Sequence, residues 1–172
     1  MHPLPQQRSV LSLDPLSSPR NLALVLDNAR QLQSAAQAGA SHPLLRGKKL
    51  GLLCEDAADP CATLFRLAAV ELGAHVAHIQ PSLSGFATPQ NVQHTARMLG
   101  RLYDAVECQG MAATLVRQVR RDAGVPVYDG IASGNHPTAG LAEQLGDGSS
   151  AADKRRFVLQ AALLQTITDR WA

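Results

Sequence analysis

The sequence has no apolar run long enough to cross a membrane and little net charge of either sign. Its apolar runs, such as Leu22–Leu26 and Leu67–Val70, are far shorter than the roughly 18 residues of a bilayer span. The 16 basic and 14 acidic side chains leave a formal charge of +2. This excludes bulk electrostatics as the force that would bind a nucleic acid or a membrane surface. We therefore expect a soluble protein with neither of these partners.

Cysteine is also scarce, with only Cys54, Cys61 and Cys108 in the chain. An odd and sparse set is typical of reduced thiols and not of a disulfide framework. The first residues, Met1–Pro5, lack the basic stretch and the apolar core of a secretory signal. Both observations predict a cytoplasmic protein.

Hydrophobic residues make up 45% of the 172 positions, which is enough for the core of one compact domain. Apolar residues at helical spacing, with prolines or capping residues before them, predict helices at Pro19–Ala38, Asp59–Gly73, from Thr88 through Leu99, Met111–Ala123 and Pro137–Leu145. Short apolar runs predict buried strands at Leu50–Cys54, His75–Ile79, Ala105–Cys108 and Val125–Tyr128.

This alternation predicts an α/β fold: an open, doubly wound parallel sheet of about four strands with helices on both faces. Ligands of such sheets bind beyond the carboxyl ends of the strands. Here those ends are followed by Cys54–Asp59, Ile79–Gly85, Cys108–Gly110 and Asp129–His136. We expect any functional crevice to be built from these four segments.

The end of the chain carries one more element. Residues 146–150, Gly-Asp-Gly-Ser-Ser, have the composition of a linker, and Ser150 with Asp153 resembles a capping box. The helix that follows, Ala151–Trp171, is too apolar to stand alone. We expect residues 151–172 to pack on the same domain as residues 1–145.

Three segments of this sequence resemble the carbamoyl-phosphate domain of the ornithine and aspartate carbamoyltransferases, the ornithine branch in particular. They are Thr95–Ala105 (TARMLGRLYDA), Gly124–Gly130 (GVPVYDG) and His136–Thr138 (HPT). The likeness runs from about Leu11 to Leu145. It implies the same α/β fold and a relation to amino-acid metabolism.

In that family a second domain, which binds the amino acid, follows this one, and the last helix of the chain returns to the first domain. The resemblance therefore implies that the linker at 146–150 replaces the second domain and that the final helix is the returning one. Retention of that helix makes physical sense, because its loss would expose an apolar face.

The family grips phosphate with a Ser-Thr-Arg-Thr-Arg segment at a helix N-terminus. Counting back from Gly73 places that segment on Ala58–Ala62, and every position is replaced. Asp59 is expected to cap the helix with its own carboxylate, and Pro60 removes one N–H donor. With Glu55 and Asp56 nearby, a phosphate would meet repulsion.

The other ligand positions of the family follow the same trend. A lysine from the neighbouring subunit aligns with Pro89, and an arginine aligns with Gln109. Of the family's His-Pro-Thr-Gln, His136 and Thr138 remain, while the glutamine is Ala139. Carbamoyl transfer by this chain alone is not expected, because both the positioning of the substrates and the stabilisation of charge are lost.

Two alternatives concern the crevice itself. His136 is either a relic that holds its loop, which we favour, or a working polar group, so the substrate-binding candidates are His136, Thr138, Gln109 and Asp59. The three cysteines and His136 are also the residue types of a thiol or zinc site, which is a further alternative, although no close Cys-x-x-Cys spacing supports it. The favoured expectation is that no metal and no cofactor is bound.

Two arginine-rich stretches are most simply solvated helix faces. One contains Arg117, Arg120 and Arg121. The other, Lys154–Arg156, lies at a helix N-terminus, where positive charge opposes the helix dipole. An acidic partner for this second stretch is the alternative.

Three hypotheses on function remain open. The leading one is a degenerate, non-catalytic relative of the carbamoyltransferases that acts as a binding or assembly module. Family members form trimers through this domain, so a homotrimer is expected, with a protein partner as a further possibility. The second is an enzyme, or an enzyme subunit completed by another chain. The third is a metal or thiol sensor.

Overall fold

The computed structural model describes residues 16–83, 85–146 and 148–168 of the 172-residue chain. Its helices are α1 (Pro19–Gln37), α2 (Pro60–Glu71), α3 (Pro89–Leu102), α4 (Ala113–Ala123) and α5 (Ala151–Ile167). Its strands are β1 (Lys49–Leu53), β2 (His75–Ile79), β3 (Ala105–Cys108) and β4 (Val127–Asp129). Two short 3₁₀ helices, η1 (Pro81–Leu83) and η2 (Ala139–Gln144), complete the order.

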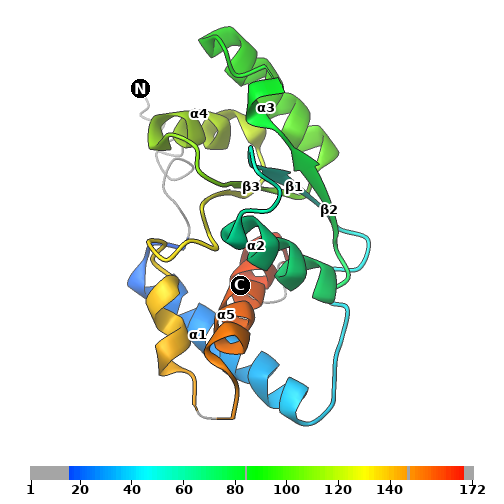
Figure 1. Ribbon diagram of the computed structural model, residues 1–172, viewed down its shortest axis with the longest axis vertical. Helices are drawn as coiled ribbons and strands as arrows, with labels where there is room; N and C mark the ends of the chain where they lie inside the picture. Colours follow the sequence, from blue (N-terminus) through cyan, green and yellow to red (C-terminus); the bar gives the residue numbers. More distant parts are fainter. Residues whose placement is uncertain (1–15, 84, 147, 169–172) are drawn as a thin grey trace, which may run out of the picture.

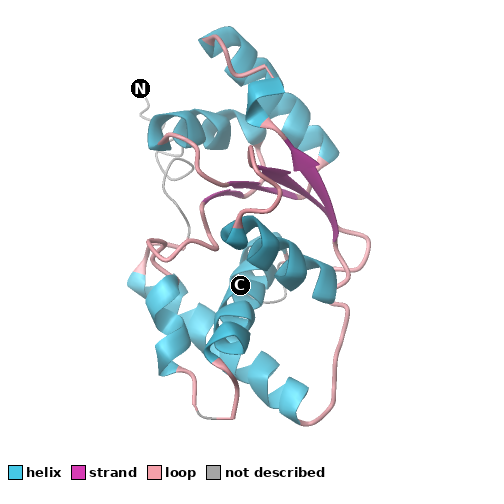
Figure 2. Cartoon of the chain, viewed as in Figure 1, coloured by secondary structure: helices cyan, strands magenta, loops and turns pink. Residues whose placement is uncertain are grey.

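The four strands form one parallel sheet in the order β2-β1-β3-β4. In Figures 1 and 2 the sheet lies between a layer of α3 and α4 and a layer that contains α2, α5 and α1. Each layer has its own core, since Val92, Leu99 and Val119 pack in one cluster and Phe65, Leu52 and Leu163 in the other. The predicted fold class, an open doubly wound α/β sheet, is confirmed.

Capping side chains begin the helices at the predicted places. Ser18 Oγ accepts a hydrogen bond from Asn21 N at 3.2 Å, and Thr88 Oγ1 accepts one from Asn91 N at 3.1 Å. In each case a proline follows as the first helical residue. At α5, Ser150 Oγ accepts from Asp153 N at 3.2 Å, while the Asp153 carboxylate pairs with Arg156.

Two predicted elements are shorter than expected. The helix predicted at Pro137–Leu145 is wrong as an α-helix, since only the 3₁₀ helix η2 forms there, in a segment that contains the weak helix former Gly140. Strand β4 begins at Val127 and not at Val125. Pro126 precedes it and has no N–H to donate to a sheet.

Helix α5 is buried on all sides along its middle, from Phe157 to Leu164. It packs against α1, α2 and η2. An apolar helix of this kind is stable only when other elements cover it, and here the α/β domain does so. Trp171 lies outside the described residues. None of the helices in the described ranges is long and apolar enough to span a bilayer.

Candidate functional site

The carboxyl ends of all four strands meet at one edge of the sheet, which we call the crevice edge. The register places Leu53 of β1 beside Ile79 of β2 and Cys108 of β3, and Cys108 beside Asp129 of β4. The segments that follow these strands carry Asp59, Gln109, His136 and Thr138. The fold therefore brings the candidate residues of the sequence to one edge, although the contacts of each are different.

Asp59 caps α2 at the crevice edge. Its Oδ1 accepts hydrogen bonds from Cys61 N at 2.8 Å and from Ala62 N at 3.3 Å. Pro60, the first helical residue, has no N–H. The N–H groups that would otherwise attract an anion at this helix start are thus satisfied by a carboxylate of the chain itself.

Two more carboxylates lie in the exposed β1–α2 loop. Glu55 accepts from the backbone N of Ser82 at 2.6 Å with Oε1 and from Ser82 Oγ at 2.8 Å with Oε2, which ties this loop to the β2–α3 connection. Asp56 Oδ1 accepts from Ala58 N at 2.9 Å. The rim is therefore acidic and is held by hydrogen bonds within the chain.

His136 and Thr138 are both buried and contact each other. His136 Nδ1 lies 2.8 Å from Thr138 Oγ1 and accepts a hydrogen bond from Thr138 N at 3.2 Å. A ring nitrogen that accepts from an N–H carries no proton, so the neutral ring has its proton on Nε2. This turn fixes the orientation of the imidazole.

Gln109 follows β3 and anchors to the neighbouring strand. Its backbone N donates to Leu53 O at 2.8 Å. Among the described residues, its side-chain oxygen Oε1 is buried and has no hydrogen-bond partner. A neutral amide at this place presents no positive charge to a phosphate.

Arg155 of α5 also reaches the crevice edge, which the sequence analysis missed. Its Nη2 donates to Ile131 O at 2.6 Å and, at 3.4 Å, to Ser133 O, and its Nη1 lies 3.4 Å from Thr138 Oγ1. Burial lowers the pKa of this guanidinium, while the nearby Cys61 and Glu107 oppose that shift. Arg155 thus fixes the segment that carries Thr138.

The expectation that Lys154–Arg156 is a solvated face is therefore wrong for two of the three residues. Arg156 Nε pairs with Glu71 Oε2 at 2.8 Å, and Arg156 Nη1 pairs with Asp153 Oδ1 at 2.8 Å. In the first stretch, Arg120 donates to Val127 O at 2.8 and 3.1 Å, while Arg117 and Arg121 are exposed. The acidic and carbonyl partners are within this chain.

Glu107 is the second residue that sequence reasoning missed. It is fully buried in β3, and its Oε1 accepts from Gly130 N at 2.9 Å and from Ile131 N at 3.2 Å. Burial raises the pKa of this carboxyl well above its usual value, although the backbone N–H groups partly oppose the shift. A signal was available, because a carboxylate inside a strand buried on both faces requires dedicated partners.

The cysteines do not come together as a metal site. Cys54 packs in the core on one side of the sheet and Cys108 in the core on the other. Burial raises the pKa of both thiols and also that of Cys61. Within the described residues no group of three or more His, Cys, Asp or Glu side chains is placed to hold a metal ion.

A four-stranded parallel sheet with helices on both faces defines an open, doubly wound α/β domain. Residues 8–145 match the family described as aspartate/ornithine carbamoyltransferase, carbamoyl-P binding domain. This match covers most of the chain. The protein therefore belongs to the aspartate/ornithine carbamoyltransferase family, as the resemblance predicted.

Individual relatives agree with this assignment. An ornithine carbamoyltransferase of Actinobacillus pleuropneumoniae is 37% identical over 126 residues, which are 73% of this chain and 38% of that protein. A catabolic ornithine carbamoyltransferase of Burkholderia mallei is 37% identical over 124 residues, covering 72% of this chain and 37% of that protein. The chain thus spans about two fifths of the length of these curated relatives.

Solved structures give the same result. The ornithine carbamoyltransferase of Thermus thermophilus superposes with a TM-score of 0.61 at 26% identity, over 78% of this chain and 46% of that one. The enzyme of Pyrococcus furiosus has the same fold, with a TM-score of 0.65 at 23% identity over 78% and 43% of the two chains.

Proposed function

We propose that this protein is a degenerate member of its family that does not catalyse carbamoyl transfer alone and acts as a binding or assembly module. The observation that carries the proposal is Asp59, whose carboxylate occupies the N–H groups at the start of α2. A phosphate at the same place would meet this negative charge, with Glu55 and Asp56 close by in sequence.

Carbamoyl phosphate binding is the direct test. We expect no heat in a calorimetric titration of the full chain up to about 5 mM ligand, a range that covers millimolar dissociation constants. An intact ornithine carbamoyltransferase titrated in parallel is the positive control. Saturable binding by this chain would contradict the proposal, because it would require an anion site at the crevice edge.

Assembly is the second half of the proposal, and we propose a homotrimer. Large apolar side chains are exposed on both helices that flank the edge strand β2: Leu67 (58%) and Val70 (53%) on α2, and Leu102 (55%) and Met98 (44%) on α3. Each helix thus exposes a pair of large apolar side chains three or four positions apart, and contiguous exposed apolar surface is typical of protein interfaces.

Light scattering across a wide concentration range tests the assembly. We expect a trimer for the wild type and dissociation for the Leu67→Glu/Val70→Glu double variant, because a charge at an apolar interface is costly to bury. Ala23→Glu, at an exposed position on α1, is the matched control and should stay trimeric. A monomeric wild type at every concentration would contradict the assembly proposal.

The arrangement of the last helix supports the assignment of residues 1–145, 146–150 and 151–172 as domain, linker and returning helix. Helix α5 covers α1, α2 and η2 of the same domain. We also propose a cytoplasmic protein, a location that suits the three free thiols.

A second candidate function is an enzyme subunit completed by another chain. The specific observation in its favour is the buried and oriented pair of His136 and Thr138. Copurification of a companion chain, with citrulline formed from ornithine and carbamoyl phosphate only when both are present, would favour this candidate over the first.

A further inference from the structure

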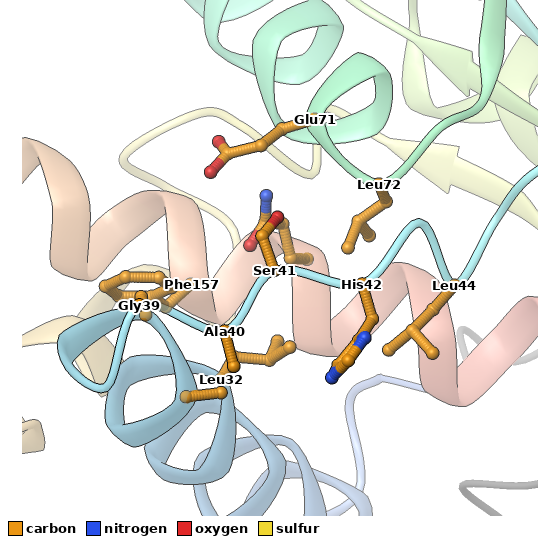
Figure 3. A pocket seen from close by; sticks show the side chains of 12 residues that line it. Leu32, Gly39, Ala40, Ser41, His42, Leu44, Glu71, Leu72 and Phe157 are labelled. Carbon is orange, nitrogen blue, oxygen red and sulfur yellow. The ribbon is translucent and has the colours of Figure 1, made fainter.

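A pocket of about 230 Å³ lies at the end of α2 that is remote from the crevice edge. It is open on one side and is lined by the end of α1, the segment Gly39–Leu44, the end of α2 and the middle of α5. Its apolar walls include Leu32, Leu72 and Phe157 (Figure 3). A cavity of about 150 Å³ holds a benzene molecule, so this pocket has room for a six-membered ring with one or two further atoms.

Two helices end at this pocket. Helix α1 ends at Gln37 with Ala38 as its C-cap, and α2 ends at Glu71 with Leu72 as its C-cap. Neither has a basic residue in its last turn. A helix C-terminus carries partial negative charge, and the cation near the α2 end is Arg156, which pairs with Glu71 and lies 5.5 Å from the centroid of the Phe157 ring. The last turn of α1 has no basic residue, so the two ends together still favour a positively charged group between them.

The carboxylate of Glu71 adds a full charge of the same sign. Arg156 pairs with Glu71 Oε2 and with Asp153 Oδ1, each at 2.8 Å. The group of Arg156, Glu71 and Asp153 therefore has a net charge of −1. Figure 3 shows the Glu71 side chain on the α2 side of the pocket, opposite the Gly39–His42 segment. No cation of the described chain pairs with its second oxygen, Oε1.

Gln160 supplies a buried polar group to the same pocket. Its side chain is 3% exposed, and its Nε2 donates to Ala68 O at 3.2 Å. This bond uses one of the two N–H groups of the amide and leaves its carbonyl oxygen as an acceptor. Gln160 therefore offers an acceptor to the pocket, beside the side chains of Ser41 and His42.

We propose that this pocket binds a small organic cation, with a primary ammonium group held by Glu71 and an apolar ring of about six carbon atoms against Leu72 and Phe157. Volume, charge and the acceptor on the wall select this ligand class together. The site lies at the opposite end of α2 from Asp59, so it is independent of the function proposed for the crevice edge.

Benzylamine and benzyl alcohol are a matched pair of probes, since they have nearly the same shape and differ in charge. In a titration of the full ¹⁵N-labelled chain followed by NMR, we expect benzylamine to bind with a dissociation constant of about 1 mM, a realistic affinity for eight heavy atoms. Amide shifts should be largest at Ala40–His42. Benzyl alcohol should bind at least about tenfold more weakly.

Three variants locate the site. Glu71→Gln should weaken benzylamine about tenfold and leave benzyl alcohol unchanged. Ala36→Phe, on the α1 wall of the pocket, should abolish binding of both probes by filling the space. Ala23→Phe, an exposed alanine of the same helix outside the pocket, is the matched control and should bind like the wild type.

The comparison of the two probes uses the wild-type chain, so it does not depend on how any variant folds. No benzylamine binding at about 20 mM, or equal affinity for benzyl alcohol, would overturn the proposal. Binding that survives Ala36→Phe would also overturn it, because it would place the ligand elsewhere. The result with carbamoyl phosphate has no bearing on these outcomes.

Discussion

Glu107 and Arg155 bind the two backbone polar groups of one residue, Ile131, in the loop that follows β4. Glu107 Oε1 accepts from the backbone N of Ile131 at 3.2 Å, and Arg155 Nη2 donates to the carbonyl O of Ile131 at 2.6 Å. One side chain comes from β3 and the other from α5, so elements far apart in sequence fix the loop that leads to His136. The order of this part of the crevice therefore depends on the last helix.

Replacing Glu107 tests this relationship directly. Glu107→Leu leaves the buried N–H of Ile131 without an acceptor, whereas Gly130 N keeps its second acceptor, Cys108 O, at 2.9 Å. The loss should lower the free energy of unfolding by about 1–3 kcal/mol. Glu107→Gln keeps an oxygen for the same N–H groups and should cost less than about 1 kcal/mol. Urea unfolding at neutral pH measures both. Equal losses would show that the accepted hydrogen bonds are not the cause.

The raised pKa of Glu107 predicts a dependence of stability on pH. The folded protein keeps a proton that the unfolded chain, with a carboxyl pKa near 4.5, has already released. The stability contributed by this proton is complete below that unfolded value and is lost as pH rises through the folded pKa. The wild type should therefore lose stability relative to Glu107→Gln as pH rises from about 4 to about 8.

Chemical unfolding of the two proteins at several pH values in this range measures the difference. The subtraction cancels the titration of all groups that they share. A constant difference across the range would contradict the raised pKa.

Arg155 is expected to stabilise the same loop from the other side. Arg155→Met leaves the carbonyl of Ile131 without its donor and should cost about 1–3 kcal/mol. Lys154→Met is the matched control on the neighbouring position of α5, for which the structure describes no such bond, and should change stability by less than about 0.5 kcal/mol. Thermal unfolding of both variants measures the effect, and equal losses would contradict the role of Arg155.

Much of the fold was predictable because its signals are local. Pro19 and Pro89 each follow a capping residue, and the apolar runs at His75–Ile79 and Ala105–Cys108 are strands with the predicted bounds. The segment Pro137–Leu145 was mispredicted because its apolar spacing is helical, but a glycine in its middle weakens an α-helix. Spacing alone does not distinguish the two kinds of helix.

The candidate site was predictable only in part, because its contacts join distant residues. The capping role of Asp59 depends on N–H groups only two and three positions downstream and followed from the sequence. The bond between Arg155 and Ile131 spans 24 positions and follows only from the packing of α5. The basic run Lys154–Arg156 predicted that Arg155 faces solvent. Helix α5 packs against the rest of the domain, and the Arg155 guanidinium therefore reaches Ile131 O instead.

Two substitutions of Asp59 separate the stability that its capping hydrogen bonds contribute from the effect of its negative charge. Asp59→Ala removes the acceptor of the Cys61 and Ala62 N–H groups and should cost about 1 kcal/mol. Asp59→Asn keeps a good capping oxygen without the negative charge and should be close to the wild type in stability. Thermal unfolding distinguishes the two outcomes. A loss of similar size in both variants would mean that the charge, and not the cap, stabilises α2.

The contact between α3 and α4 depends on Gly100. A Cβ atom at this position would lie 1.7 Å from the carbonyl oxygen of Ala123, so Gly100→Ala requires the two helices to separate. Alanine normally stabilises a helix relative to glycine by up to about 1 kcal/mol, yet here we expect a net loss of about 2 kcal/mol or more. Gly140→Ala, where the added atom would meet nothing within 4 Å, is the matched control and should be nearly neutral.

Urea unfolding compares the two variants, and a Gly100→Ala protein as stable as the wild type would show that α3 and α4 are not packed this closely. Because α3 and α4 cover one face of the sheet together, the loss should appear as a lower midpoint of a single cooperative transition.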